Sequence, residues 1–175
     1  MDIMSIRPLR SNDFEGLRRL FDYAHEEVKY DPDYGDYIRL KKPTQKDRIA
    51  QFNRWQKEAR NGDLLFYVAE EGSRISGFCF VRKASVPDSE LSHVGILGVR
   101  VEKELRGKGI GSKLIEYAIK QSRKRFEIIE VEILGLNGRS RHIFRNFGFK
   151  TWGVAPGFVK RGKRHIDMEH MYLKL

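Results

Sequence analysis

Residues 104–114, ELRGKGIGSKL, hold glycines at alternate positions 107, 109 and 111. The residues before this loop alternate as in a strand, and those after it have apolar helical spacing. Glycines at a strand-to-helix junction let the backbone approach a ligand closely. The free N–H groups of the helix's first turn and the helix dipole then point at one place. The loop therefore predicts an α/β fold with an anion site, to which Arg106 and Lys108 add positive charge. The alternative is a glycine-rich turn with no ligand.

Two common phosphate-binding motifs do not fit this loop. A Walker-type loop requires Gly-Lys-[Ser/Thr] after four intervening residues, whereas here Ser112 precedes Lys113. A dinucleotide-binding motif requires a third glycine at the position that Ser112 occupies, counted from Gly107 and Gly109. We therefore expect a diphosphate site of another kind.

Hydrophobic periodicity along the whole chain predicts the order β-α-α-β-β-β-α-β-α-β-β. Asn12 and Thr44 are the expected starts of the first two helices. Ile49, Phe52 and Ala59 are expected to form the inward face of the second helix, which ends near Gly62. This order predicts a single domain over residues 1–175, with one mixed sheet and helices on both of its faces. The expected strands lie near residues 3–9, 64–70, 74–84, 91–101, 126–134, 149–160 and 165–175, and the last two helices near 109–123 and 139–146.

Composition favours a water-soluble enzyme or binding protein. The chain of 175 residues is 40% hydrophobic and 33% charged, and no segment approaches the roughly 20 apolar residues of a membrane helix. A single cysteine, Cys79, excludes an internal disulfide and a cysteine-based zinc site, and the five histidines lack metal-ligand spacing. We expect a cytoplasmic protein with no signal peptide, no membrane contact and no metal.

The net charge of +10 lies entirely in the second half of the chain. Residues 1–99 contain 16 basic and 16 acidic residues, and residues 100–175 contain 18 and 8. A positive field attracts nucleic acid or a phosphorylated small molecule. Charge alone does not decide between these partners.

Two motifs together resemble the GCN5-related N-acetyltransferase (GNAT) family. Arg106 to Gly111 matches the family's Arg/Gln-x-x-Gly-x-Gly/Ala signature directly after a strand. The segment NGRSRHIFRNFGF, residues 137–149, resembles its second motif, with Asn137, Gly148 and Phe149 in place. The resemblance covers essentially the whole chain and is strongest from Leu91 to Phe149.

The resemblance implies the fold and the cofactor. The fold is α/β (α+β): one mixed, mostly antiparallel sheet of about seven strands with about four helices, splayed between strands 4 and 5. The anion is then the diphosphate of acetyl-CoA, the acyl donor, bound by the backbone from Arg106 to Ser112. The pantetheine arm follows the fourth strand. The cofactor residues implied are Leu97, Gly98, Val99, Val101, Arg106, Gly107, Lys108, Gly109, Ile110, Gly111, Ser112, Asn137, Ser140 and Phe144.

By the same resemblance, acetyl passes directly from sulfur to an amine, which must first lose a proton. Some family members carry a glutamate base on the fourth strand, where this chain has His93. Others carry it on the fifth strand, five residues before the motif's asparagine, and Glu132 has that position here. Either side chain could accept the proton. The competing interpretations are a solvated strand face for Glu132 and a surface strand end for His93.

Two other positions depart from the family pattern. Phe144 replaces the tyrosine that protonates the leaving thiolate in many members, and Ser140 replaces an alanine. A thiol titrates near about 8.5, so thiolate can leave without an acid. Tyr172 on the last strand is a weak candidate for that acid.

The acceptor side is implied by the family's fold to lie between the first two helices and the closing hairpin. The connecting segment YDPDYGDY offers Tyr30, Asp31, Asp33 and Tyr34, which suit an ammonium group through ion pairing and cation–π contact. The alternative is an ordinary polar loop. We expect the acceptor to be a small amine or amino acid, or a protein N-terminus.

Two other functions compete with an N-acetyltransferase. A CoA-binding regulator without catalysis is encouraged by Phe144. A nucleic-acid-binding module, which we consider unlikely, would require basic residues interleaved with exposed aromatic side chains on one face. Edge-strand pairing in the family is also compatible with a homodimer.

Overall fold

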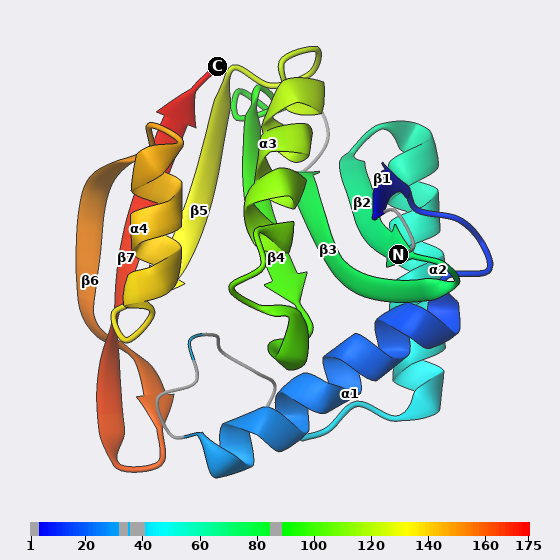
Figure 1. Ribbon diagram of the computed structural model, residues 1–175. Helices are drawn as coiled ribbons and strands as arrows, with labels where there is room; N and C mark the ends of the chain where they lie inside the picture. Colours follow the sequence, from blue (N-terminus) through cyan, green and yellow to red (C-terminus); the bar gives the residue numbers. More distant parts are fainter. Residues whose placement is uncertain (1–3, 32–34, 36–40, 85–88) are drawn as a thin grey trace.

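The computed structural model describes residues 4–31, 35, 41–84 and 89–175. Within these residues, seven strands form one sheet in the order β1-β2-β3-β4-β5-β7-β6, with four α-helices around it (Figure 1). Only β4 and β5 pair in parallel, and the other neighbours are antiparallel. The predicted element order and the GNAT-type sheet are thus confirmed. The strands are β1 (Ser5–Pro8), β2 (Leu64–Glu71), β3 (Arg74–Lys83), β4 (Val94–Val101), β5 (Ile128–Leu134), β6 (Lys150–Arg161) and β7 (Arg164–Lys174).

Helices α1 (Phe14–Tyr30) and α2 (Gln45–Asn61) form the N-terminal helical layer. Thr44 caps α2 as predicted, because its hydroxyl accepts from the Asp47 N–H while the Asp47 carboxylate accepts from the Thr44 N–H. Gly62 ends α2 with φ +80°. Two predictions here were wrong. The N-cap of α1 is Asp13 rather than Asn12, and Ile49 is 43% exposed. Phe52 faces inward as predicted, and Trp55 is buried beside it.

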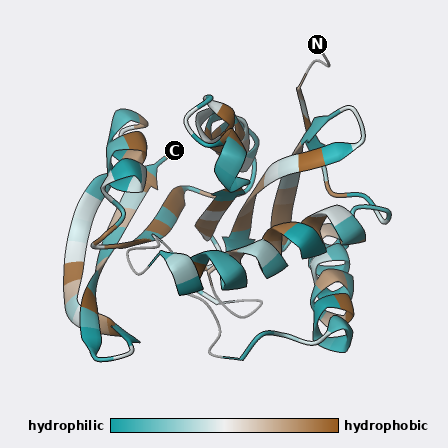
Figure 2. Cartoon of the chain, turned by 60° about the horizontal axis from the view of Figure 1, so that its bottom comes forward, coloured by the Kyte–Doolittle hydropathy of each residue, from teal (hydrophilic) through white to brown (hydrophobic). Residues whose placement is uncertain are grey.

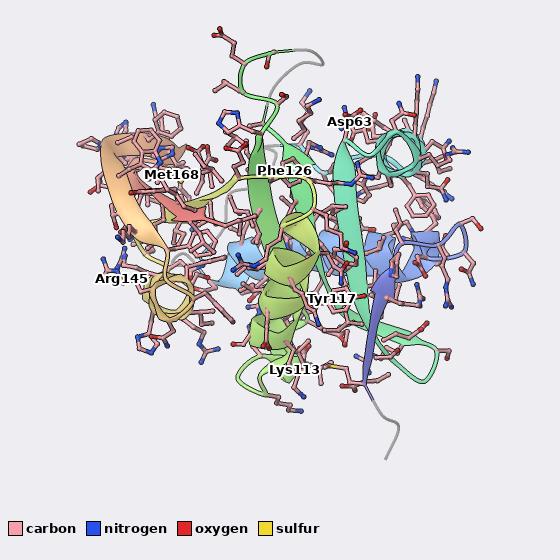
Figure 3. The ribbon with its side chains drawn as sticks, turned by 90° about the horizontal axis from the view of Figure 1, so that it is seen from above. Asp63, Lys113, Tyr117, Phe126, Arg145 and Met168 are labelled. Atoms are coloured by element: carbon pink, nitrogen blue, oxygen red, sulfur yellow. The ribbon has the colours of Figure 1, made fainter. Side chains whose placement is uncertain are left out.

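Helices α3 (Ile110–Ser122) and α4 (Gly138–Asn146) cover the other face of the sheet. In α3, apolar residues at helical spacing are buried against β2, β3 and β4. Figure 3 shows the structure from above, with α3, which carries Lys113 and Tyr117, and α4, which carries Arg145, on the side opposite α2.

Two hydrophobic cores result, one on each face of the sheet. The larger lies between the sheet and α3 with α4, and includes Leu114, Ile129 and Met171. The other lies under α1 and α2 and includes Leu17, Trp55 and Phe78. Figure 2 shows the hydrophobic central strands between α1 and α3. Each fully buried Leu, Ile or Phe side chain stabilises the fold by about 1.5–3 kcal/mol. These cores hold β4, β5 and the loop between β4 and α3 in fixed positions.

Several of the buried charged groups form ion pairs. Arg7 bonds Asp13 at 2.8 Å and Glu70 at 2.7 Å, which fixes β1 to the start of α1 and to β2. Burial raises the pKa of the Cys79 thiol well above its usual range, so this side chain is a core residue as predicted. None of the described helices has the length and apolar character needed to cross a membrane.

Candidate active site

Strands β4 and β5 are paired over only three positions. Val94 lies beside Ile128, Gly95 beside Ile129, and Ile96 beside Glu130. Beyond Ile96 and Glu130 the two strands diverge toward their C-terminal ends (Figure 1). The predicted splay is confirmed, and its closed end lies at the row of Ile96 and Glu130.

The backbone of β4 turns hydrogen-bonding groups into this splay. The carbonyl of Val94 accepts from Ala84 N–H and the N–H of Glu102 donates to Ser76, each at 2.9 Å, so even-numbered residues bond on the β3 side. Because successive residues of a strand point their backbone groups to opposite sides, those of Leu97 and Val99 point toward β5. These are residues implied to bind the pantetheine arm. At position 98 a glycine is needed for packing, since a Cβ there would lie 2.5 Å from the Phe80 ring.

The glycine loop joins β4 to α3 through a short 3-10 turn, Lys103–Leu105. Gly107 (φ +81°) and Gly109 (φ +82°, the N-cap of α3) have left-handed backbone conformations that favour glycine. A Cβ on either residue would meet no atom within 4 Å. Open space therefore lies against this backbone, at the positive end of α3. Ile110 is 4% exposed, which leaves only its main chain for a ligand.

Three side chains of α1 form hydrogen bonds or ion pairs with the connection from β4 to α3 at regular intervals. They are spaced four residues apart on the helix, a rise of about 6 Å, and their partners are spaced two residues apart in the connection. The contacts are Arg19 to Glu102 at 2.9 Å, Tyr23 Oη to Glu104 at 2.7 Å, and Arg106 Nη2 to Glu27 Oε2 at 2.8 Å. We call these three contacts the α1 ladder. The Tyr23 hydrogen bond lowers the pKa of Glu104.

Arg106 has a different role from the one expected from sequence. Its two Nη atoms bond the buried Glu27 carboxylate, and its Nε donates to the Val101 carbonyl at 3.0 Å. The guanidinium therefore fastens the loop to α1 and β4, rather than lying ready for a phosphate. The exposed Lys108 side chain remains a source of positive charge on the loop.

The second motif forms the start of α4. The Oδ1 atom of Asn137 accepts from the Ser140 N–H at 3.0 Å and caps the helix. Its Nδ2 atom donates to the Gly35 carbonyl at 2.7 Å, which joins the α1–α2 connection to α4. Phe144 is 2% exposed and packs edge-on against Phe149, so its ring lies in the core and not in the splay.

The two candidate bases occupy different places. Glu132 lies on β5 inside the splay, two residues beyond the closed end, and its side chain is exposed. His93 was expected on the fourth strand, but it lies in the turn before β4, where its carbonyl accepts from Glu127 and Ile128. It is thus on the far side of the closed end from the splay.

Strand β7 brings two more polar side chains to the same sheet face as Glu132. Val131 and Ile133 are buried in the core under α3 and α4, so Glu130 and Glu132 face the other way. Met171 and Glu169 likewise face α4, and Tyr172 and His170 therefore share the face of Glu130 and Glu132. Tyr172 lies directly beside Glu130, and His170 beside Glu132. Of these two side chains, Tyr172 was predicted from sequence as a weak candidate for the acid.

Glu169 anchors β7 on the α4 side. Burial by itself would raise the pKa of Glu169, but hydrogen bonds from Thr151 and Arg141 outweigh it and lower the pKa. Arg145 also contacts this carboxylate at 3.4 Å. The result is a fixed β7 against which Glu132 and its neighbours are aligned.

The expected acceptor loop is only partly described. Tyr30 is 82% exposed at the end of α1, and the N–H of Asp31 donates to the Glu27 carbonyl. Asp33 and Tyr34 lie outside the described residues. A shallow cavity of about 660 Å³ lies elsewhere, along the outer face of α1 and the β2–β3 turn. Among the described residues, no group of three or more His, Cys, Asp or Glu side chains is placed to hold a metal ion.

The geometry can now be compared with known proteins. The model of the "Acetyltransferase (GNAT) family" matches residues 20–149. The chain belongs to the GNAT acetyltransferase family. Its fold matches that of yncA from Salmonella typhimurium, solved with its cofactor acetyl-CoA, at a TM-score of 0.82 and 20% identity, over 98% of this chain and 94% of that one.

Curated relatives match over shorter lengths. The chain is 31% identical to the 5-NmdU N-acetyltransferase of Pseudomonas phage PaMx11 over 101 residues, which are 57% of this chain and 67% of the relative. It is 27% identical over 74 residues to YwnH of Bacillus subtilis (strain 168), a candidate phosphinothricin acetyltransferase. These residues are 42% of this chain and 45% of YwnH, so the chain spans about half of that relative.

Proposed function

We propose that the protein is an acetyl-CoA-dependent N-acetyltransferase that acetylates a primary amine by direct attack in a ternary complex. The observation that carries the proposal is the open backbone of Gly107 and Gly109 at the N-terminus of α3, next to the splay of β4 and β5. A diphosphate on the loop and a pantetheine arm along Leu97 and Val99 would use both features at once. The excess of basic residues after position 99 is also compatible with an anionic donor.

The chemistry requires a free amine, support for the oxyanion and departure of the thiolate. The main-chain N–H groups of Leu97 and Val99 point into the splay and would donate to the thioester oxygen as charge develops on it. Glu132 is the preferred base because it lies inside the splay, whereas His93 lies beyond the closed end. Tyr172, beside Glu130, would protonate the leaving sulfur. Phe144, buried in the core, takes no part in proton transfer.

The acceptor is a small amine or amino acid, or a protein N-terminus. The phage relative is named for 5-NmdU, which adds that compound to the acceptors worth testing. A CoA-binding regulator is the second candidate, and it would bind acetyl-CoA without turning over any of these amines. Tyr30 and Asp31 remain proposed acceptor contacts at the end of α1.

The donor site is tested by calorimetric titration with acetyl-CoA. We expect micromolar binding by the wild type and a loss of at least about 10-fold in Gly109→Ala, whose Cβ would enter the space left for the diphosphate. Gly162→Ala is the matched control, because Gly162 also has a positive φ (+59°) and open space, but lies in the β6–β7 turn. Both variants bear similar backbone strain of about 1–2 kcal/mol. Equal affinities in the two variants, or no binding by the wild type, would contradict the proposal.

A further inference from the structure

One sheet face holds a row of proton-carrying side chains next to the closed end of the splay. His170 and Glu132 are directly opposite each other on β7 and β5, and Tyr172 and Glu130 form the adjacent row. Side chains opposite each other on antiparallel strands have Cβ atoms about 4.5–5.5 Å apart. A proton can therefore pass between His170 and Glu132 directly or through one water.

Aromatic rings from β6 flank the imidazole of His170. The Trp152 ring centroid lies 5.2 Å from the His170 ring, and that of Phe158 lies 6.4 Å away in an edge-on arrangement. Trp152 lies at a break in the β6–β7 register between Thr151 and Gly153. Trp152 is 58% exposed and Phe158 65% exposed, so both rings keep a free surface beside the imidazole.

We propose that His170 is a catalytic base of the acetyl transfer, acting with Glu132, and that Trp152 and Phe158 bind the acceptor beside it. The inference rests on the proposed function. Glu132 accepts a proton from the incoming ammonium and passes it to His170, the residue opposite on β7, which leaves the nitrogen lone pair free. That lone pair forms the C–N bond to the acetyl carbon as the C–S bond breaks. The electron pair leaves on sulfur, and the nitrogen's second proton ends on the thiolate.

This arrangement selects a class of acceptor. The Glu132 carboxylate attracts a cation by charge, and the Trp152 and Phe158 rings attract it by cation–π contact. The exposed rings also favour an acceptor with an apolar or aromatic portion next to its amine. The acceptor is therefore a primary amine that is protonated near neutral pH, attached to such a portion.

The test compares His170→Gln, Glu132→Gln and His165→Gln with the wild type. His165 is the matched control, since it lies on the same strand but is exposed near the hairpin turn. Thiol release is followed at saturating acetyl-CoA with 2-phenylethylamine, spermidine and a peptide bearing an N-terminal alanine. Calorimetry with acetyl-CoA and thermal unfolding accompany each variant.

A base is required only while the amine is protonated. We expect His170→Gln to lose about 100-fold in kcat/KM at pH 7 and to recover at least about 10-fold of this near pH 9.5, as the free amine becomes more abundant. Acetyl-CoA affinity and thermal stability remain those of the wild type, and His165→Gln stays within about 2-fold. Among the described residues, the titratable groups that β5, β6 and β7 place on this face include Glu130, Glu132, Lys150, Tyr172 and Lys174. Each variant is therefore compared with the wild type at the same pH.

Three outcomes overturn the inference. His170→Gln can keep wild-type kcat/KM at pH 7, or its defect can stay constant across pH, which is the behaviour of a structural role. A wild type that binds acetyl-CoA but turns over none of the three amines also counts against His170, while the donor site stands. Failure of acetyl-CoA binding instead overturns the proposed function itself.

Discussion

The two sides of the splay are built in different ways. On the β4 side, the glycine loop is held by backbone conformation and by the α1 ladder, and the buried Glu27 carboxylate fixes Arg106. On the β5–β7–β6 side, exposed side chains project from the sheet, among them Glu132, Trp152 and Phe158. Under the proposed function, the donor contacts fixed main chain, and the acceptor contacts side chains that sequence change can replace. The proposal therefore assigns donor affinity to one side and acceptor specificity to the other.

Of the variants that test this comparison, Glu27→Gln on the β4 side is expected to have the largest effect. Glu27→Gln removes the charge that holds Arg106, and we expect acetyl-CoA to bind about 10-fold more weakly while kcat stays unchanged. The free energy of unfolding falls by about 2 kcal/mol, because a charged hydrogen-bonded partner is lost inside the protein. Titration calorimetry, steady-state kinetics and chemical denaturation measure the three quantities. Glu26→Gln is the neighbouring control, since the Glu26 carboxylate pairs with Lys29 at the surface.

If the α1 ladder positions the glycine loop, Glu27→Gln raises the KM for acetyl-CoA and leaves kcat unchanged. If Glu27→Gln loses stability but keeps wild-type affinity for acetyl-CoA, the ladder only holds the fold together. If Glu26→Gln weakens binding as strongly, the effect is general surface charge and not the grip on Arg106.

The second prediction concerns the β5–β7–β6 side and a variant that leaves the proposed acetyl-CoA site intact. Trp152→Ala removes the exposed ring beside His170, and we expect the KM for 2-phenylethylamine to rise about 10-fold, in keeping with about 1 kcal/mol for an aromatic contact. Acetyl-CoA affinity stays that of the wild type. Leu91→Ala, another exposed apolar side chain, is the control at a distance from the splay. An unchanged amine KM would remove Trp152 from the acceptor site.

The third prediction concerns pH and the anchoring of β7. The pKa of Glu169 is lowered in the folded protein, so its contribution to stability is complete above the unfolded-state pKa of about 4.3 and is lost as pH falls through the folded-state pKa. In Glu169→Gln, the fall in free energy of unfolding between pH 6 and pH 3 should be smaller than in the wild type. Urea denaturation across this range measures it, and parallel curves would contradict the assigned pairing.

The smallest prediction separates two neighbouring glycines. Gly111 has a helical backbone, and a Cβ there would lie 3.6 Å from Val101, an ordinary contact. Gly111→Ala should therefore stabilise the protein by about 0.5–1 kcal/mol and change acetyl-CoA affinity by less than about 2-fold. Gly109→Ala shows the opposite on both counts. Thermal unfolding and calorimetry on the pair decide whether the loop needs glycine for conformation or for space.

Local signals in the sequence predicted most of the fold. Thr44 and Gly62 act through neighbouring residues, and each has its expected role. The errors came where distant contacts decide. Asp13 starts α1 in place of Asn12, and its carboxylate bonds Arg7 across the sheet edge. Ile49 is 43% exposed, whereas Trp55 is buried and packs against Phe66 on β2.

The site could be predicted where a motif determines the backbone conformation. It could be predicted less well where side chains from distant parts of the sequence contact each other. The glycine loop and the splay followed from residues 99–111 and from the family resemblance. Arg106 appeared to be a phosphate ligand because nothing near it in sequence reveals Glu27, 79 residues away. Nothing near His170 in sequence reveals that it lies opposite Glu132. Alternation along β5 and β7 would have placed Glu132 and His170 on one face only if the pairing register had been known.

The three-position junction of β4 and β5 has a thermodynamic consequence for the whole protein. The two antiparallel halves of the sheet meet along a seam between β4 and β5. Strand pairing in this seam stops after Ile96 and Glu130. Acetyl-CoA lying in this seam would supply amide groups where a neighbouring strand supplies them elsewhere, so the cofactor acts as a removable strand. A ligand that binds only the folded state at 100 times its Kd adds about 2.7 kcal/mol to stability. The cellular supply of acetyl-CoA would then set not only the rate of this protein but also its lifetime as a folded chain.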